Sequence, residues 1–205
     1  AHTRFPAAVA AHSAALLSEL AGWEKRAGIA RAAPFAIPLP AETVADETDR
    51  RVGGLTLRFL HVPGHAPDQL AVYEPESGTL WAADILSDVE IPFVSDNLAD
   101  YEHTLEKLAQ LSISALVPGH GNPTTDAADI RARFAHDRAY LAELRQRVAA
   151  AVTSGLSLAQ TLAACADMRY RRFRTAPADN AEPHRLNVVS AFAQLGRPAD
   201  GEGSA

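Results

Sequence analysis

Residues 60–86 read LHVPGHAPDQLAVYEPESGTLWAADIL, and this stretch decides the fold because short apolar runs alternate in it with turns. The run at 55–62 alternates between two faces, as a half-buried strand does, and 69–75 and 79–86 are apolar enough to be the next strands. A second Pro-Gly-His turn ends another apolar run at 114–120. We therefore predict a small sheet whose strands end in turns that carry polar side chains.

Helices are predicted around this sheet. Apolar residues recur at helical spacing in 13–28, 98–111 and 126–155, and 157–168 and 183–196 are predicted as shorter helices. Strands with an intervening helix, followed by a run of helices, indicate the α/β (α+β) class.

The composition limits the classes of binding partner that we expect. The chain has 205 residues and a formal net charge of −6, and its only dense cationic stretch is RYRRFR at 169–174. We therefore expect a small-molecule substrate, no nucleic acid and, because no apolar run reaches the ~18 residues of a membrane span, no membrane. A cytoplasmic location is expected, and a homodimer is left open. The single cysteine, Cys165, excludes an internal disulfide and a cysteine-based zinc site, and we expect it in the core.

Three polar residues follow apolar strand-like runs: His65, Asp84 and His120. Strand ends lie on the rim of a sheet, where polar groups can converge without disturbing the core. Imidazole and carboxylate are good zinc ligands, and one carboxylate can bridge two metals. Taken singly, each Pro-Gly-His is more simply interpreted as a plain turn, and Asp84 as a residue that caps the segment after its strand. Together they predict a metal site in which Asp84 is also the catalytic residue.

The segments HVPGHAPDQLAVYEPESGTLWAADIL and ALVPGHG resemble the second half of the metallo-β-lactamase fold hydrolases. The resemblance implies a partial αββα sandwich: 1–125 as the C-terminal portion of that domain, 126–196 as a helical extension, and 197–205 as a disordered tail. It implies two Zn²⁺ per complete site, with Fe or Mn as alternatives, and His65, Asp84 and His120 as ligands. The implied reaction is cleavage of an ester, thioester or amide bond by metal-bound hydroxide, most simply in a glyoxalase II-like enzyme. A β-lactamase, a lactonase or a di-iron redox protein remains an alternative.

The His-x-His-x-Asp-His cluster of that family is missing, since only His2 and His12 precede residue 61 and neither has its spacing. We interpret the chain as an N-terminally truncated member whose remaining ligands precede residue 1, and we expect this chain alone to be inactive. The competing interpretation is a degenerate, non-catalytic member that acts as a binding or scaffold protein.

The helical part offers three further candidates. His184 and Asn187 open the last predicted helix, near where the C-terminal helices of the family approach substrate, and Tyr140 lies in the long helix before it. We predict that these residues bind substrate, with helix capping as the alternative for His184 and Asn187.

Overall fold

A computed structural model describes residues 17–31, 33, 44, 47–168 and 180–196. Its contacts divide the chain into two compact units, 1–43 and 44–205, and each is described by itself. The first contains a helix at 17–27, inside the predicted 13–28. The cationic stretch 169–174 and the predicted tail 197–205 lie outside the described residues.

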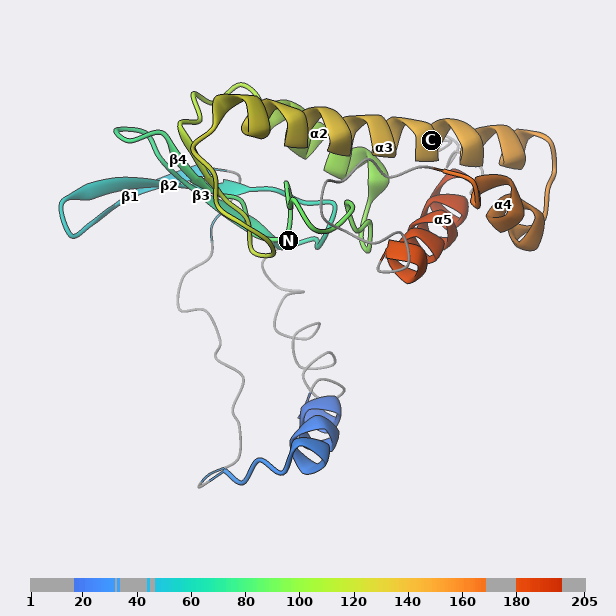
Figure 1. The fold of residues 1–205 in the computed structure, drawn as a ribbon, viewed down its shortest axis with the longest axis horizontal. Helices are drawn as coiled ribbons and strands as arrows, with labels where there is room; N and C mark the ends of the chain where they lie inside the picture. Colours follow the sequence, from blue (N-terminus) through green and yellow to red (C-terminus); the bar gives the residue numbers. More distant parts are fainter. Residues whose placement is uncertain (1–16, 32, 34–43, 45–46, 169–179, 197–205) are drawn as a thin grey trace, which may run out of the picture. The chain divides into compact units, whose positions relative to one another are not determined.

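The second unit is built on a five-stranded sheet in the order β1-β2-β3-β4-β5 (Figure 1). The strands are β1 (Glu47–Val52), β2 (Leu55–His61), β3 (Leu70–Glu74), β4 (Thr79–Trp81) and β5 (Ala115–Val117). Neighbours pair antiparallel from β1 to β4, and β5 joins β4 in parallel. The turn between β1 and β2 is Gly53-Gly54, both with positive φ, as a tight hairpin turn requires.

The prediction of a strand at 79–86 is wrong for its second half, because β4 ends at Trp81. The next residues leave the sheet through two positive φ angles, 51° at Ala83 and 57° at Leu86. A side chain with a Cβ rarely adopts this conformation, so apolar composition alone could not have predicted the bend. The bend turns Asp84 out of the strand and onto the rim of the sheet.

In the described part of this unit, four helices accompany the sheet: α2 (Leu98–Leu108), α3 (Ala127–Thr153), α4 (Leu158–Cys165) and α5 (Ala181–Leu195). Asn97 caps α2 through two backbone N–H groups, and Ser157 forms a capping box with Gln160 at the start of α4. The long α3 packs against α2, α4 and α5. Within the described part of the chain, no helix combines the length and apolar character that a membrane span needs.

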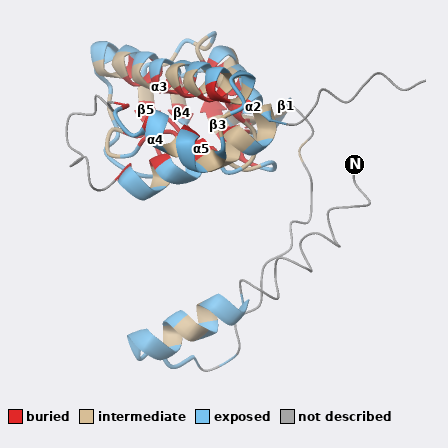
Figure 2. Ribbon diagram, turned by 90° about the vertical axis from the view of Figure 1, so that its right-hand side faces the viewer, coloured by how far each residue is buried: buried red, intermediate tan, exposed pale blue. Residues whose placement is uncertain are grey.

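One core joins the sheet to the helices (Figure 2). Leu60, Leu80 and Leu116 point from the strands into it, where they meet Leu105 of α2 and Leu141 of α3, and all five are almost fully buried. Because this core continues through the helices, 44–205 is one mixed α+β unit, as the predicted class requires. The predicted division at residue 125, which separates strands from helices by sequence, stays a prediction.

The opposite face of the sheet is also apolar. Phe59, Val72, Trp81 and Val117 lie side by side across four paired strands. Trp81 is 41 % exposed and the other three are partly exposed. The residues of 44–205 that the structure describes therefore leave this row incompletely covered.

Candidate metal centre

The strand directions bring the three predicted ligands to one edge of the sheet. Since β2 and β4 both pair antiparallel with β3, they run in the same direction, and β5 runs parallel to β4. His65, Asp84 and His120 each follow the carboxyl end of one of these strands. The pairing continues beyond the strands, with a 2.6 Å hydrogen bond from Gly119 N to the carbonyl of Ala83, so the Asp84 and His120 loops stay side by side.

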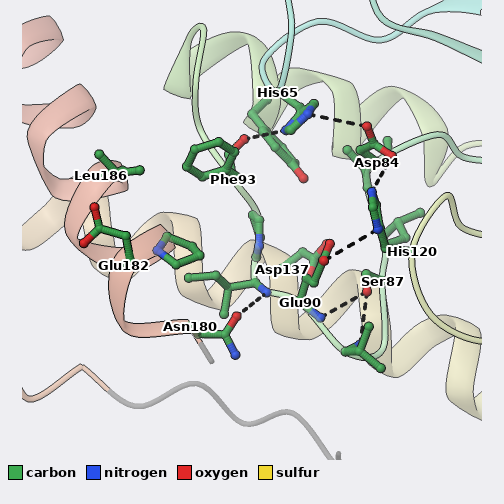
Figure 3. Close-up of a pocket in the computed structure, with 17 residues that line it drawn as sticks. His65, Asp84, Ser87, Glu90, Phe93, His120, Asp137, Asn180, Glu182 and Leu186 are labelled. Atoms are coloured by element: carbon green, nitrogen blue, oxygen red, sulfur yellow. Dashed lines mark hydrogen bonds and ion pairs between the residues drawn. The ribbon is translucent and has the colours of Figure 1, made fainter. Parts of the chain in front are cut away.

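The carboxylate of Asp84 lies between the two histidines (Figure 3). His65 Nε2 is 3.6 Å from Asp84 Oδ2, and His120 Nε2 is 3.4 Å from Asp84 Oδ1. Each carboxylate oxygen therefore faces a different imidazole. This is the arrangement expected if the carboxylate bridges two sites.

A backbone carbonyl fixes the His65 ring. His65 Nδ1 lies 2.9 Å from the carbonyl oxygen of Phe93, which can only accept a hydrogen bond. The proton must therefore sit on Nδ1, which leaves Nε2 directed at Asp84. Carbonyl oxygens hold the second nitrogen of many metal-binding histidines in this way. Phe93 was not among the predicted site residues, because the loop that carries it has no strand or helix pattern.

His120 is more open to solvent, with 56 % of its side chain exposed, and its second nitrogen faces a carboxylate. His120 Nδ1 is 3.7 Å from Glu90 Oε1, a residue not singled out in the sequence. Glu90 lies in the irregular segment after Asp84, and only the proximity of the two loops brings it to His120.

Neither glycine of the two Pro-Gly-His turns has room for a side chain, but the neighbour that is too close differs between them. Gly64 has φ +119°, and a Cβ there would lie 2.4 Å from the backbone of Tyr101 on α2. Gly119 has no positive φ, but a Cβ on it would lie 2.4 Å from Asp84 Oδ1. Gly64 is therefore needed both for its backbone conformation and for the close approach to α2, whereas Gly119 is needed for space beside Asp84.

A buried arginine braces the Asp84 and His120 loops against α3. Arg133, 4 % exposed, donates to the carbonyls of Leu86 and Asn122 from one nitrogen and to Asp129 from another. Asp88 accepts two hydrogen bonds from Asn122 and lies near Arg133. Burial alone would raise the pKa of Asp88, but the bonds from Asn122 and the charge of Arg133 outweigh it and lower that pKa. Arg133 thus fixes the spacing of both loops.

The trio opens into a pocket of about 530 Å³ between the loops, α2, α3 and the start of α5. One part of the wall is apolar and includes Leu86, Ile91, Pro92, Phe93 and Leu186. The charged lining residues are all carboxylates, namely Asp84, Glu90, Asp137 and Glu182, so the described residues bring neither lysine nor arginine to this wall. Asp137, 1 % exposed, was missed, although its position between Phe134 and Leu141 on the buried face of α3 was a signal.

The three predicted substrate-binding residues lie behind the pocket and are absent from its lining. Tyr140 and His184 are joined by a 3.0 Å hydrogen bond, and the amide of Asn187 donates to Tyr140 Oη at 2.8 Å. His184 Nε2 meets the carbonyl of Cys165, a core residue as expected, and burial lowers the pKa of His184. Because their polar atoms are engaged in this network, the geometry gives no support to direct substrate contact. Helix capping does not describe them either.

The spacing within the trio fits metal ions. Two ligands at 2.0–2.2 Å from a tetrahedral metal lie about 3.3–3.6 Å apart, and the two histidine–carboxylate pairs are separated by 3.6 and 3.4 Å. An imidazole nitrogen of His65 and a carboxylate oxygen of Asp84 face each other at this distance, so a cation between them could be bound by both. Among the described residues, no three His, Cys, Asp or Glu side chains converge on a single ion. The trio therefore forms two histidine–carboxylate pairs that share Asp84.

Comparison with known proteins gives the family. Residues 2–120 match the metallo-beta-lactamase superfamily. The chain belongs to this superfamily. Among curated relatives, the linear primary-alkylsulfatase of a Pseudomonas species is 26 % identical over 125 residues, which is 58 % of this chain and 24 % of the relative. A probable metallo-hydrolase of Bacillus subtilis is 31 % identical over 99 residues, covering 42 % of this chain and 31 % of the relative.

Solved structures of the superfamily share the fold. A sec-alkylsulfatase from a Pseudomonas species superposes with a TM-score of 0.63 at 18 % identity, covering 74 % of this chain and 26 % of that one. A metallo-beta-lactamase family protein from Thermus thermophilus has a TM-score of 0.56 at 25 % identity, covering 80 % and 51 %. The predicted fold family is therefore confirmed. The chain spans between a quarter and a third of the length of the two curated relatives.

Proposed function

We propose that this chain supplies part of the metal centre of a metal-dependent hydrolase that cleaves an ester, thioester or amide bond. The observation that carries the proposal is the Asp84 carboxylate, which presents one oxygen to His65 and the other to His120. Membership of a superfamily whose relatives include a metallo-hydrolase and alkylsulfatases supports the general reaction class. We further propose two zinc ions, with iron or manganese as alternatives, and a His-x-His-x-Asp-His cluster outside this sequence as the source of the remaining ligands.

Each residue of the site has a defined task in this proposal. Divalent metals bound here would lower the pKa of a coordinated water and polarise the bond to be cleaved. The Phe93 carbonyl keeps the proton of His65 on Nδ1 and so keeps Nε2 available as a ligand. Asp84 belongs to both ligand pairs, and Glu90 places a carboxylate oxygen 3.7 Å from His120 Nδ1. The apolar wall around Phe93 and Leu186 would shield the reacting bond from bulk water.

The lining also limits the substrate. On the described wall, an anionic group near Glu90, Asp137 or Glu182 would face a carboxylate, which disfavours its binding at those positions. The apolar wall favours a substrate with a hydrocarbon part beside the scissile group. A glyoxalase II-like thioester hydrolase stays part of the proposal, and the substrate panel below tests it beside hydrolysis of more apolar esters.

The test is turnover by protein reconstituted with zinc, iron or manganese. The panel should contain a glutathione thioester, an apolar thioester, a lactone, a β-lactam and a primary alkyl sulfate. Asp84→Ala should abolish turnover and lower the bound metal, whereas Glu106→Gln, which changes an exposed carboxylate on α2, should alter neither. Turnover that survived Asp84→Ala would contradict the bridging role.

Two further results decide between the alternatives. The gene sequence ahead of the codon for Ala1 should encode a His-x-His-x-Asp-His motif, and protein that includes it is the form to assay. If a start codon directly preceded Ala1, or if the whole gene product bound metal without cleaving any member of the panel, a binding or scaffold role would replace the hydrolase.

A further inference from the structure

Helix α5 carries three amide side chains at intervals of seven residues: Asn180 at its N-terminus, Asn187 in the middle and Gln194 near its end. Seven residues advance an α-helix by almost two full turns and about 10.5 Å, so the three amides form a row on one side. Asn180 and Asn187 are 3 % and 0 % exposed. Amides are rarely buried without a partner that requires them.

The partner of this row is the segment 91–98, which is irregular as far as Asn97 and ends at Leu98, the first residue of α2. Asn180 occupies the N-cap position of α5, but its side chain makes no hydrogen bond to the first turn of the helix. Instead, Asn180 Oδ1 accepts a hydrogen bond from Ile91 N at 3.1 Å (Figure 3). Asn187 Oδ1 accepts from Val94 N at 2.7 Å, and Gln194 Oε1 accepts from Leu98 N at 2.8 Å. The partners are three and four residues apart, which in an extended chain is about 10–13 Å. The segment therefore runs alongside α5 in step with its amide row.

Two of the three amides, those of Asn187 and Gln194, also donate to this segment. Asn187 Nδ2 donates to the carbonyl of Pro92 at 2.6 Å, and Gln194 Nε2 donates to the carbonyl of Asp96 at 3.0 Å. Pro92 and Val94, the residues on either side of Phe93, are thus held by the single side chain of Asn187. With its neighbours fixed on one side, the carbonyl of Phe93 is directed to the other side, where it meets His65 Nδ1.

The segment contacts the His65 turn at further points. Ser95 Oγ donates to the carbonyl of His65, and the N–H groups of Asp96 and Asn97 both lie 3.2 Å from the carbonyl of Gly64. One surface of 91–98 is therefore bonded to α5 and the other to the turn that carries His65. The segment is thus a direct physical link between the helix and that turn.

We propose that α5 sets the orientation and tautomer of His65 through this amide row, with Asn187 as the principal positioning residue. The helix does not touch the ligand; it holds the loop whose carbonyl holds the ligand. The proposal takes from the proposed function only that His65 is a metal ligand. It also accounts for Asn187, which the sequence singled out as substrate-binding and which the structure places behind the pocket wall.

The test uses the full chain with Asn187→Ala, and Val188→Ala as the matched control. Val188 is a fully buried neighbour on α5 that makes no hydrogen bond to the loop through its side chain. Long-range ¹H–¹⁵N spectra report which nitrogen of His65 carries the proton. Hydrogen exchange reports the protection of the Val94 amide, and titration with Zn²⁺ alone reports binding.

In Asn187→Ala we expect faster exchange at Val94, mixed tautomers at His65 and zinc affinity lowered about 10-fold, the lower end of the effect of removing a partner of a ligand histidine. Val188→Ala should change none of these. Should Asn187→Ala fail to fold, Gln194→Met, which keeps the volume but loses both bonds to the loop, should show the same changes more weakly.

An unchanged Nδ1–H tautomer in a folded Asn187→Ala or Gln194→Met protein would overturn the proposal, as would an equal change in Val188→Ala. Absence of hydrolysis with every substrate would contradict the proposed function but leave this result intact, because the tautomer is observed without metal or turnover.

Discussion

Replacement of Gly64 by alanine tests how tightly the His65 turn is packed. Gly64 has φ +119°, and an added Cβ would lie 2.4 Å from Tyr101 Cα and N and 2.5 Å from Tyr101 Cβ. These atoms belong to the first turns of α2, so they cannot rotate away as the end of a flexible side chain could. Either the turn or the helix must move.

The expected cost has two parts. A left-handed conformation costs a residue with a Cβ about 1–2 kcal/mol, and forcing an extra carbon into a packed site costs about 1–3 kcal/mol more. Because the obstacle is backbone, we expect a total near the upper end, about 4 kcal/mol. Gly53→Ala is the matched control: its φ is +58° and nothing lies within 4 Å of the added carbon, so only the conformational cost applies.

Urea unfolding followed by circular dichroism measures both variants under the same conditions. We expect Gly64→Ala to lose about 2–3 kcal/mol more than Gly53→Ala, by the packing cost just given. Two variants that differed by less than about 1 kcal/mol would refute the reasoning, because steric overlap with α2 would then contribute little.

Three other perturbations follow from the site. Arg133→Met should lower the free energy of unfolding by about 3 kcal/mol, since it leaves Asp88 and two loop carbonyls without their cation. Arg131→Met, which changes an exposed arginine of the same helix, is the control. Equal losses of stability in urea for the two variants would contradict the bracing role of Arg133. Burial lowers the pKa of His184 below its ordinary 6.5, so the unfolded chain binds the extra proton and stability should fall as pH drops below about 6.5. His184→Gln should reduce this dependence of the unfolding free energy on pH. An unchanged pH dependence would exclude His184 as its cause. The chain as given should bind zinc weakly, because His65 and His120 share only Asp84; a stoichiometric zinc retained after dialysis, measured by elemental analysis, would contradict this.

The strand ends could be predicted from the sequence because they rest on local rules. Alternation in 55–62, the Gly53-Gly54 turn and the apolar runs before His65 and His120 each depend on a few neighbouring residues. The convergence of the trio followed from one additional rule, that strands of one direction end at one edge.

The features of the fold and of the site that could not be predicted depend on contacts between segments distant in the sequence. The early end of β4 arises from positive φ at Ala83 and Leu86, neither of which is a glycine. Phe93 and Glu90 enter the site only because the loop after Asp84 folds back over it. The role of Asn187 needs its partner Val94, which is 93 residues away in the sequence. Local patterns carry no information about such a pairing.

The pairing of 91–98 with α5 also sets the order in which the centre can form. The bonds from Ile91, Val94 and Leu98 to α5 span 89, 93 and 96 residues, so each of them closes a long loop of this unit. During synthesis, His65, Asp84 and His120 leave the ribosome well before α5 does. A nascent chain therefore carries all three ligands while the support for His65 is still absent. Metal-binding geometry at His65 is consequently a late event in the folding of this unit, reached only after α5 has been made.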